Sequence, residues 1–180
     1  MADFMDIIKN RRSIRRYQDK PIPDELLNGI LEAGRWAQSW ANTQCWEIVV
    51  VRDDAIKEAL QNTLPEANPG RKCLAQAPVV LAVCGKLESS GYYKGNVTTK
   101  FGDWFLFDLG IVTQNMALAA HALGMGSVVL GLFDHDAAKQ VLDVPEGCEL
   151  ATLMPLGFPE GEVKTPPRRE VSEFVHQDRF

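Results

Sequence analysis

A short segment near the start of the chain gathers side chains that suit an anion. Four arginines and one serine lie within six residues, at Arg11, Arg12, Ser13, Arg15 and Arg16. Guanidinium groups offer planar forks of donors that match phosphate geometry, and a serine hydroxyl adds a small donor beside them. The segment therefore predicts a phosphate-binding site. The alternative interpretation is a solvated helix end whose bases complement the helix dipole.

The charge of the whole chain indicates that this basic segment acts locally. The 180 residues include 19 Lys and Arg against 24 Asp and Glu, which gives a formal net charge of −5. Nucleic acid and anionic lipid attract proteins with a net or regional excess of positive charge. We therefore expect neither a nucleic acid nor a membrane partner. Near the other end of the chain, Arg168 and Arg169 form a second basic pair that could return to the same site.

Other residue types that do chemistry are present but form no recognisable motif. The four cysteines are widely spaced and predict reduced, mostly buried thiols without a metal site: Cys45, Cys73, Cys84 and Cys148. Neither a G-x-G-x-x-G dinucleotide motif nor a P-loop occurs. His121 lies within an apolar stretch, so we expect it to pack rather than to act as a base. No Ser/His/Asp set and no carboxylate pair emerges, and we predict no catalytic side chain.

Targeting signals are equally scarce. The segment 1–6 has acidic residues where a secretory signal would have basic ones, and its apolar run is too short for such a signal. No stretch reaches the roughly 18 apolar residues that a membrane span needs. We therefore expect a cytoplasmic protein.

The elements that must position these residues alternate between helices and strands. Apolar spacing predicts a short helix from Phe4 that ends before the arginines, and a second helix over about 25–37 that follows and is capped by the segment 21–24. The residues from about 101 to 123 predict a long helix with almost no polar face, which must lie in a core or against another subunit. Shorter helices are expected over about 53–64 and 134–142, and strands over 46–51, 79–84, 127–133 and 150–156. The pattern predicts a layered α/β or α+β domain.

Polar loops between these elements are the expected places for ligand contacts. The segment 38–44 separates the second helix from the first strand, and it contains Ser39 and Asn42. The segments 62–74 and 89–100 are further candidate loops of this kind, and residues 89–96 form a glycine-rich polar stretch that we expect to be mobile.

Four blocks of the chain, in order, resemble the FMN-dependent nitroreductase family. Residues 11–17 resemble the family motif R-R-S-x-R-x-[FY], and residues 39–46 resemble its segment P-S-x-x-N-x-Q-P-W. Residues 108–127 resemble its long interface helix and following strand, and residues 156–171 resemble its C-terminal blocks. Gln38 and Cys45 stand where the family usually has proline, which should loosen the loop between them.

The resemblance implies an α+β, nitroreductase-like fold, with a central, mostly antiparallel sheet flanked by helices in an intertwined homodimer. Residues 1–180 would form a single FMN-binding domain, in which 162–180 is a C-terminal extension that wraps around the partner subunit. The implied cofactor is FMN, with NADH or NADPH as co-substrate. The implied reaction is ping-pong reduction of a small electrophilic acceptor, such as a nitroaromatic or a quinone.

The resemblance also implies which residues contact the cofactor. The phosphate and ribityl chain would be held by Arg11, Arg12, Ser13 and Arg15, with Arg168 or Arg169 closing from the tail. The loop residues Gln38, Ser39 and Asn42 would reach a flavin bound mainly by the other subunit. The backbone at Leu130 and Gly131 would face the flavin ring near N5, and Asn68 and Lys72 would lie near the family's second flavin-contacting basic position.

Plainer interpretations remain open for several of these residues. Ser39 and Asn42 could be turn residues that satisfy their own backbone. Gly131 could be a simple β-bulge, and Lys72 a surface lysine. Trp40, Trp104 and Phe105 could form an aromatic wall over the flavin or pack in the core.

Two other functions also fit the arginines. One is a non-enzymatic module that binds a phosphorylated ligand or nucleic acid, which would be colourless and strongly salt-dependent in its binding. The other is a family member with a different reaction, such as enone or flavin reduction. A flavoprotein, in contrast, should purify yellow.

Overall fold

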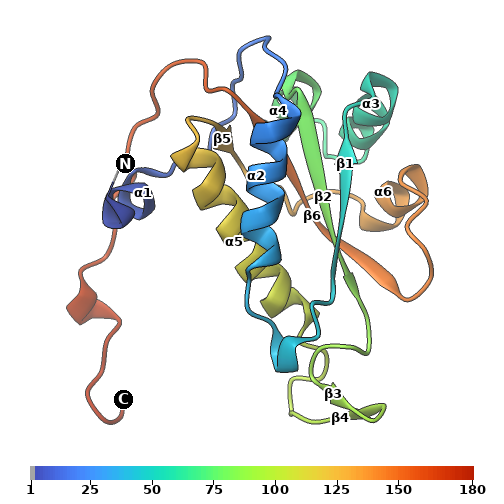
Figure 1. The fold of residues 1–180 in the computed structure, drawn as a ribbon, viewed down its shortest axis with the longest axis vertical. Coiled ribbons are helices and arrows are strands. Elements are labelled where there is room, and N and C mark those ends of the chain that lie inside the picture. The colour runs from blue at the N-terminus through green and yellow to red at the C-terminus, as the bar shows by residue number, and fades with distance from the viewer. Residues whose placement is uncertain (1–2) are drawn as a thin grey trace.

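Four antiparallel strands form the sheet at the centre of the fold, in the order β1-β2-β6-β5 (Figure 1). The computed structural model describes residues 3–180, so Met1 and Ala2, which belong to the segment examined for an export signal, lie outside the described residues. The strands are β1 (Trp46–Val51), β2 (Val79–Lys86), β5 (Gly126–Ser127) and β6 (Cys148–Gly157), and β3 (Tyr92–Tyr93) and β4 (Asn96–Val97) form a separate hairpin. The helices are α1 (Phe4–Asn10), α2 (Asp24–Arg35), α3 (Asp54–Asn62), α4 (Gly70–Gln76), α5 (Phe105–Ala122) and α6 (His135–Val141), with short 3-10 turns η1 (Trp40–Asn42) and η2 (Val171–Glu173).

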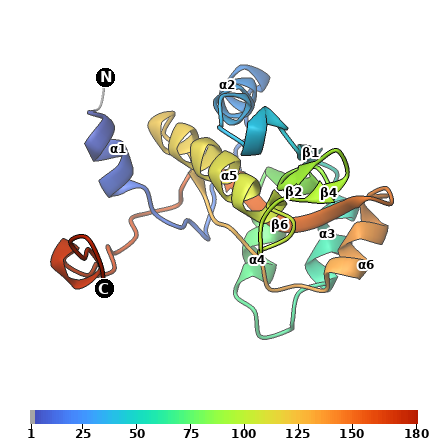
Figure 2. The ribbon, with the colours of Figure 1, turned by 90° about the horizontal axis from the view of Figure 1, so that it is seen from below.

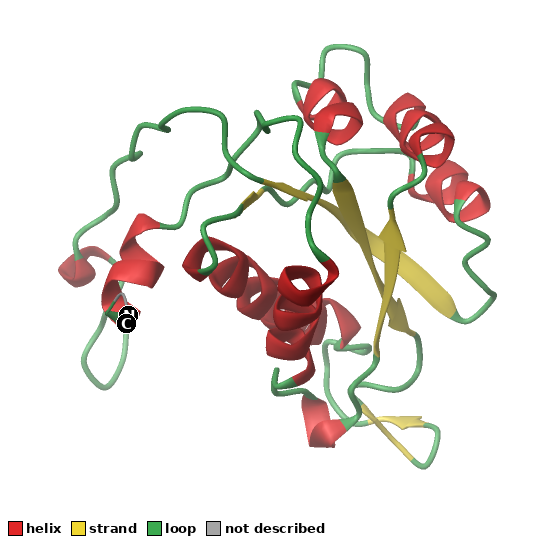
Figure 3. Cartoon of the chain, turned by 45° about the horizontal axis from the view of Figure 1, so that its top comes forward, coloured by secondary structure: helices red, strands yellow, loops and turns green. Residues whose placement is uncertain are grey.

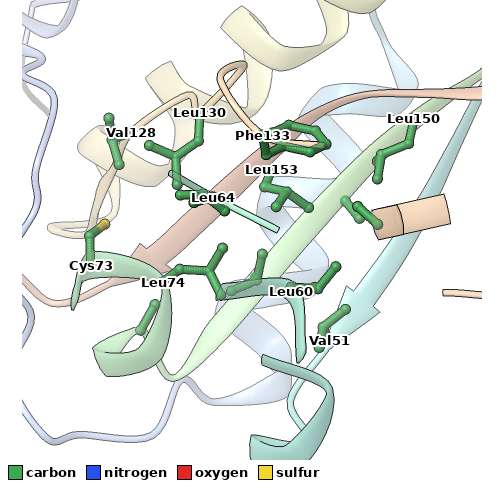
Figure 4. Close-up of a cluster of buried hydrophobic side chains, with 14 of the residues drawn as sticks. Val51, Leu60, Leu64, Cys73, Leu74, Val128, Leu130, Phe133, Leu150 and Leu153 are labelled. Carbon is green, nitrogen blue, oxygen red and sulfur yellow. The ribbon is translucent and has the colours of Figure 1, made fainter. Parts of the chain in front are cut away.

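The central strand β2 explains why helices cover both faces of the sheet. Its residues 79–85 are all buried, and successive side chains of a strand point to opposite faces. Val79, Leu81 and Val83 pack with α2 and α5, whereas Val80 and Ala82 pack into the cluster formed with α3, α4 and α6. Figure 2 shows the resulting layers, with α2 and α5 on one side of the sheet and α3, α4 and α6 on the other. Figure 4 shows the second cluster, where Leu60, Leu74 and Leu153 meet.

The α+β fold with a mostly antiparallel sheet, flanked by helices, is confirmed by this architecture. Most elements lie where the sequence predicts them, and the aspartates that precede α3 and α6 cap these helices. Asp53 accepts a hydrogen bond from the Ile56 amide, and Asp134 accepts one from the Ala137 amide, each at 3.0 Å. The segment 21–24 supplies no side-chain cap, because α2 begins at Asp24 and that carboxylate pairs with Arg52 instead.

Two sequence predictions about elements are wrong in detail. The expected strand over 127–133 pairs as a strand only at Gly126–Ser127, and beyond it Leu130 alone bridges to Leu153 on β6. Val129 and Leu132 are exposed, so this apolar run does not form a buried strand. The long helix begins at Phe105 rather than near 101, because the segment before it belongs to the loop that carries β3 and β4.

Several apolar side chains of the single chain are left uncovered. Helix α5 buries Leu109, Val112 and Met116 but exposes Leu106 and Phe107, which are 62% and 59% accessible. Helix α1 has no buried residue, and the segment 160–180 is exposed throughout. Figures 1 and 3 show α1 and this C-terminal segment standing away from the sheet. None of the helices within residues 3–180 combines the length and the apolar character required to span a membrane.

Candidate functional site

The arginine segment runs from the end of α1 onto the edge of the sheet. Ser13 forms a parallel bridge with Ser127, and the Ile14 amide donates to the Ser127 carbonyl at 2.9 Å. The buried Tyr17 hydroxyl donates to the Ile14 carbonyl at 2.8 Å and lies 3.0 Å from the Pro155 carbonyl. Burial raises the pKa of Tyr17, so the hydroxyl keeps its proton. These contacts fix the backbone of the segment and do not involve its arginine side chains.

Four of the sequence-predicted residues and one arginine of the tail line a single pocket of about 260 Å³: Arg11, Arg12, Ser13, Arg15 and Arg168. No carboxylate belongs to this lining, although Glu160 and Glu162 line the neighbouring pocket. Burial and the nearby charges of Arg12 and Arg168 lower the pKa of Arg11. Cations held close together without a countercharge repel one another, and a bound anion would relieve that repulsion.

The arginines of this pocket differ in how far their donors are already used. The Arg12 guanidinium donates to Thr165 Oγ1 at 3.2 and 2.7 Å and to the carbonyls of Lys9 and Arg11 at 2.6 and 2.7 Å. It therefore ties the C-terminal tail to the end of α1. Within residues 3–180, the side chains of Arg11 and Arg15 form neither a hydrogen bond nor an ion pair, so their donors can reach a ligand.

The tail brings one of its two arginines to this pocket. Arg168 lines it, with only long contacts of 3.4 and 3.3 Å to the carbonyls of Pro166 and Pro167. Arg169 instead lies over the Phe174 ring, at 5.4 Å from its centroid. The geometry favours Arg168 over Arg169 as the residue that approaches the arginine segment.

A second basic pocket of about 580 Å³ adjoins the first one through Arg15. Lys72 lines it together with Arg15, Arg16, Pro69 and Gln76, and Glu160 is the one carboxylate in this lining. Asn68 stands at the start of α4, where its side chain accepts from the Gly70 amide at 2.8 Å and donates to the Leu132 carbonyl at 3.2 Å. Asn68 thus connects α4 to the segment after Leu130, which places its amide group in a structural role.

The segment at Leu130 and Gly131 leaves the sheet, and the Gly131 carbonyl lies 3.2 Å from His135 Nε2. Leu130 exchanges backbone hydrogen bonds with Leu153 at 2.9 and 3.0 Å, and Thr152 Oγ1 donates to its carbonyl at 2.8 Å. Gly131 is exposed, and a Cβ added there would meet no atom within 4 Å. Packing within the chain therefore does not require glycine at this position, and the space in front of it is free for a ligand.

The loop that contains Gln38, Ser39 and Asn42 satisfies much of its own backbone. Ser39 Oγ accepts from the Gln44 amide at 3.0 Å, and the Asn42 amide donates to the Ser39 carbonyl at 3.2 Å. Ala41, Asn42 and Gln44 have φ values of 44°, 57° and 50°, in the left-handed region that residues other than glycine rarely adopt. Ser39 is thus a turn residue within this chain, and hydrogen bonds supply restraint where Gln38 and Cys45 replace the family's prolines.

A buried aspartate that the sequence analysis did not single out holds this loop. Asp108 is 1% exposed, and both of its carboxylate oxygens lie 3.1 Å from the Trp40 amide. The Ser90 hydroxyl also donates to it, and the Cys45 thiol lies at 3.7 Å. Burial, followed by the negative charge of Asp108, raises the pKa of Cys45 to about 12. The signal in the sequence was a single acid in a helix that is otherwise apolar, because such a residue is rarely buried without partners.

Aromatic side chains gather beside the same loop. The Trp40 and Trp104 rings are 5.3 Å apart, and Trp104 also contacts Phe101 and Phe107 at 6.2 and 5.2 Å. Phe105 packs instead against the core beneath α2 and α5. Trp40 and Trp104 therefore form an aromatic pair beside this loop, and Phe105 takes the core position that was the alternative.

The two groups of predicted residues lie at opposite ends of α5 (Figure 1). Asp108, near the start of this helix, contacts the loop at Trp40, and His121, near its end, lines a pocket of about 430 Å³ with Arg11 and Arg12. A helix rises about 1.5 Å per residue, so these two positions are about 20 Å apart along its axis. A single chain therefore keeps the arginine pocket and the loop at 38–42 too far apart to surround one phosphate or one ring.

Side chains that could do other chemistry are dispersed. All four cysteines are free and buried, as the sequence predicts. In the part of the chain from residue 3 onward, no group of histidine, cysteine, aspartate and glutamate side chains is arranged to hold a metal ion.

Comparison with known proteins gives concordant results. The sequence model of the Nitroreductase family matches residues 8–158. An NADH dehydrogenase of Thermus thermophilus is 33% identical over 177 residues, which cover 84% of this chain and 84% of that protein. An NADPH-flavin oxidoreductase of Vibrio harveyi is 29% identical, over 100% of this chain and 75% of that protein. The solved structure of the Vibrio harveyi NADPH:FMN oxidoreductase in complex with NAD⁺ superimposes with a TM-score of 0.84 and 26% identity, covering 98% of this chain and 77% of that one.

Proposed function

Because this chain belongs to the nitroreductase family, we propose that its arginine pocket holds the phosphate of FMN and that it reduces a small electrophilic acceptor at the expense of NAD(P)H. The protein is an NAD(P)H-dependent oxidoreductase. The observation that carries the cofactor proposal is a pocket lined by arginines and by no carboxylate. Arg11 and Arg12 are adjacent in the sequence, and Arg168 comes to the same pocket from the C-terminal tail.

The pocket has the properties that a phosphate group needs. A phosphate monoester carries close to two negative charges, and Arg11 and Arg15 have unused guanidinium donors with which to bind it. Ser13 supplies a hydroxyl in the same lining. Arg12 would mainly hold the tail and the end of α1 in place around the pocket, because its donors are already bonded to Thr165 and to the carbonyls at the end of α1. Arg168 would close the pocket from the tail.

The adjoining surface suits the rest of the cofactor. Arg15 and Lys72 would place positive charge beside the ring, where charge near the ring nitrogens tunes flavin reactivity. The exposed Gly131, next to Leu130, would let its backbone approach the ring, and Asn68 would keep this segment in position through the Leu132 carbonyl. When bound, FMN would supply the ability to accept a hydride from NAD(P)H and to deliver two electrons to the acceptor. The balanced reaction with a quinone is NAD(P)H + H⁺ + quinone giving NAD(P)⁺ and hydroquinone.

A second copy of the chain would complete the site. Gln38, Ser39 and Asn42 lie about a helix length from the arginine pocket of their own chain, so they would contact a flavin held by the partner. The exposed Leu106 and Phe107 of α5 would be covered in the dimer, and the apolar residues Val171 and Phe174 of the 162–180 extension would pack on the partner subunit. The single domain would then consist of residues 1–161 with this extension.

The site contains no acid–base pair, and the proposed chemistry does not need one. The residues of the chain bind the phosphate, orient the ring and exclude water, while the cofactor carries the electrons. Ping-pong exchange requires NAD(P)H and the acceptor to use the same exposed ring face in turn, and a nitroaromatic or a quinone would fit that requirement.

The test is to purify the protein, release its chromophore and identify it, and then to add NADH or NADPH without oxygen. We expect a yellow protein that contains FMN and is bleached by the reduced nicotinamide, and that regains its colour when a quinone is added. A colourless protein that takes up no added FMN, and that binds polyanions with a steep salt dependence, would support the non-enzymatic alternative instead.

A further inference from the structure

The hairpin segment, residues 87–104, is fixed at its base and exposed at its tip. At the base, the Asp103 carboxylate accepts from the Glu88 and Phe105 amides at 2.7 and 3.0 Å, and the buried Ser90 donates to Asp108. At the tip, β3 and β4 are joined by a tight turn in which Lys94 and Gly95 have φ values of 51° and 77°. The base therefore fixes where the hairpin leaves the rest of the fold.

The hairpin segment is tied directly to the loop at 38–45. Asp108 bonds both the Trp40 amide of that loop and the Ser90 hydroxyl of the hairpin segment. The Trp40 and Trp104 rings lie 5.3 Å apart across the same junction. Any ligand that this loop reaches in a dimer will therefore lie near the hairpin segment as well.

The hairpin segment combines exposed aromatic rings with positive charge, at the β3–β4 turn and at the turn that follows β4. Tyr93 and Phe101 are 66% and 70% exposed, and the Lys94 and Lys100 ammonium groups lie 5.3 and 4.9 Å from their ring centroids. Between residues 91 and 101 these two lysines are the only charged residues, in a chain whose formal net charge is −5. The acids Glu88 and Asp103 lie at the base, where the Asp103 carboxylate is used by backbone amides.

We propose that the hairpin segment selects acceptors that are aromatic and negatively charged, such as aromatic carboxylates. This inference rests on the proposed function, because it identifies the acceptor of the same flavin site. The apolar part of the acceptor packs against Tyr93 and Phe101, and its anionic group pairs with Lys94 or Lys100. Each cation–π contact sets a lysine charge beside an apolar surface, which is the combination that an aromatic anion requires.

The experiment compares two acceptors of similar size, 4-nitrobenzoate and the neutral 4-nitrobenzyl alcohol. The FMN-loaded enzyme is reduced with one equivalent of dithionite, so that binding of NAD(P)H does not enter, and the rate of reoxidation is followed without oxygen. Each acceptor takes two electrons and two protons and yields a nitroso compound and water. The variant Lys94→Gln/Lys100→Gln removes both charges but keeps long polar side chains.

We expect the second-order rate constant for 4-nitrobenzoate to fall about tenfold in the double variant, because fixed charges near a site raise the local concentration of an oppositely charged substrate. The rate constant for 4-nitrobenzyl alcohol should stay within about twofold, and the difference between the acceptors should shrink as salt increases. The matched control is Lys20→Gln, since Lys20 also lies over an aromatic ring, 4.0 Å from the Phe158 centroid, but outside the hairpin segment.

If the double variant lowered the rate constant equally for both acceptors, or for neither, the proposed selection of acceptors by charge would be wrong. An enzyme that binds FMN and is bleached by NAD(P)H, yet shows either of those results, disproves this inference alone. A protein that binds no FMN disproves the proposed function and this inference together.

Discussion

The arginine pocket and the loop at 38–45 are organised in opposite ways, although both are predicted to hold the same cofactor. The pocket crowds Arg11 with Arg12 and Arg168 and leaves donors unused. The loop, in contrast, uses its polar groups on itself and on Asp108. One region is thus incomplete without an anion, and the other is preformed by the fold. The difference suits a ligand that has a charged end and a flat, neutral end.

The largest effect is expected where the preformed region is broken. Asp108→Ala leaves the part-buried Trp40 amide and the buried Ser90 hydroxyl without their acceptor, and each unsatisfied buried donor costs about 1–3 kcal/mol. We expect the free energy of unfolding of the FMN-free protein to fall by about 2–4 kcal/mol. Urea unfolding, with the slope of the transition compared between variants, measures this loss.

The matched control for this variant is a surface carboxylate that also has a partner. Asp24→Ala removes an exposed ion pair with Arg52, which should cost under about 1 kcal/mol because solvent screens it. If Asp108→Ala were no more destabilising than Asp24→Ala, the loop would not depend on Asp108 and the contrast between the two regions would be lost.

The arginine pocket should respond to the ligand rather than to unfolding. Arg11→Ala removes a charge-assisted contact to the phosphate, so we expect FMN affinity to weaken by about 1–3 kcal/mol. Riboflavin has the same ring without the phosphate, and its affinity should not change. Titration of both ligands into the FMN-free protein, followed by quenching of flavin fluorescence, gives the two dissociation constants.

Arg35→Ala serves as the control for this measurement, since Arg35 is an exposed arginine of α2 that pairs with Glu32. It should leave both affinities unchanged. Equal weakening of FMN and riboflavin by Arg11→Ala would mean that Arg11 contacts the ring or acts through the fold, and that the phosphate lies elsewhere.

The sequence predicted the charged region of the site better than the preformed one. Arginines that lie side by side, such as Arg11 and Arg12, indicate a basic pocket through local composition alone. The same holds for the central strand over 79–84, whose apolar run requires cover on both faces. The second basic pair already suggested that the tail could return to this site, but the sequence did not distinguish Arg168 from Arg169, because that choice depends on the path of a distant tail.

Features that depend on contacts between distant segments were missed. Asp108 is one acid in an apolar helix, and its role appears only once the loop at Trp40 and the hairpin segment at Ser90 are folded around it. The expected strand over 127–133 failed for a related reason. Its residues favour a strand, but pairing also needs a partner edge. After Ser127, only a long hydrogen bond from the Val128 amide to Pro155 and the bridge between Leu130 and Leu153 join this run to β6.

The smallest expected effect connects the arginine pocket to a neighbouring histidine. Burial, and then the charges of Arg11 and Arg12, lower the pKa of His121 below its usual value of 6.5. The unfolded chain therefore binds a proton at this residue more readily than the folded chain does, and His121 makes the folded state less stable as pH falls below about 6.5. The variant His121→Gln should remove that part of the pH dependence.

FMN should change this titration because its phosphate would offset the two arginines that repel the His121 proton. We expect FMN to move the pKa of His121 upward, whereas riboflavin, which lacks the phosphate, should leave it in place. The chain has 3 histidines, so NMR titration of the ring protons, assigned with His121→Gln, resolves the shift. An upward shift with FMN alone would place the phosphate charge beside Arg11 and Arg12. The same shift with both ligands would instead indicate a change of structure on binding, since the ring that they share carries no charge that could act on His121.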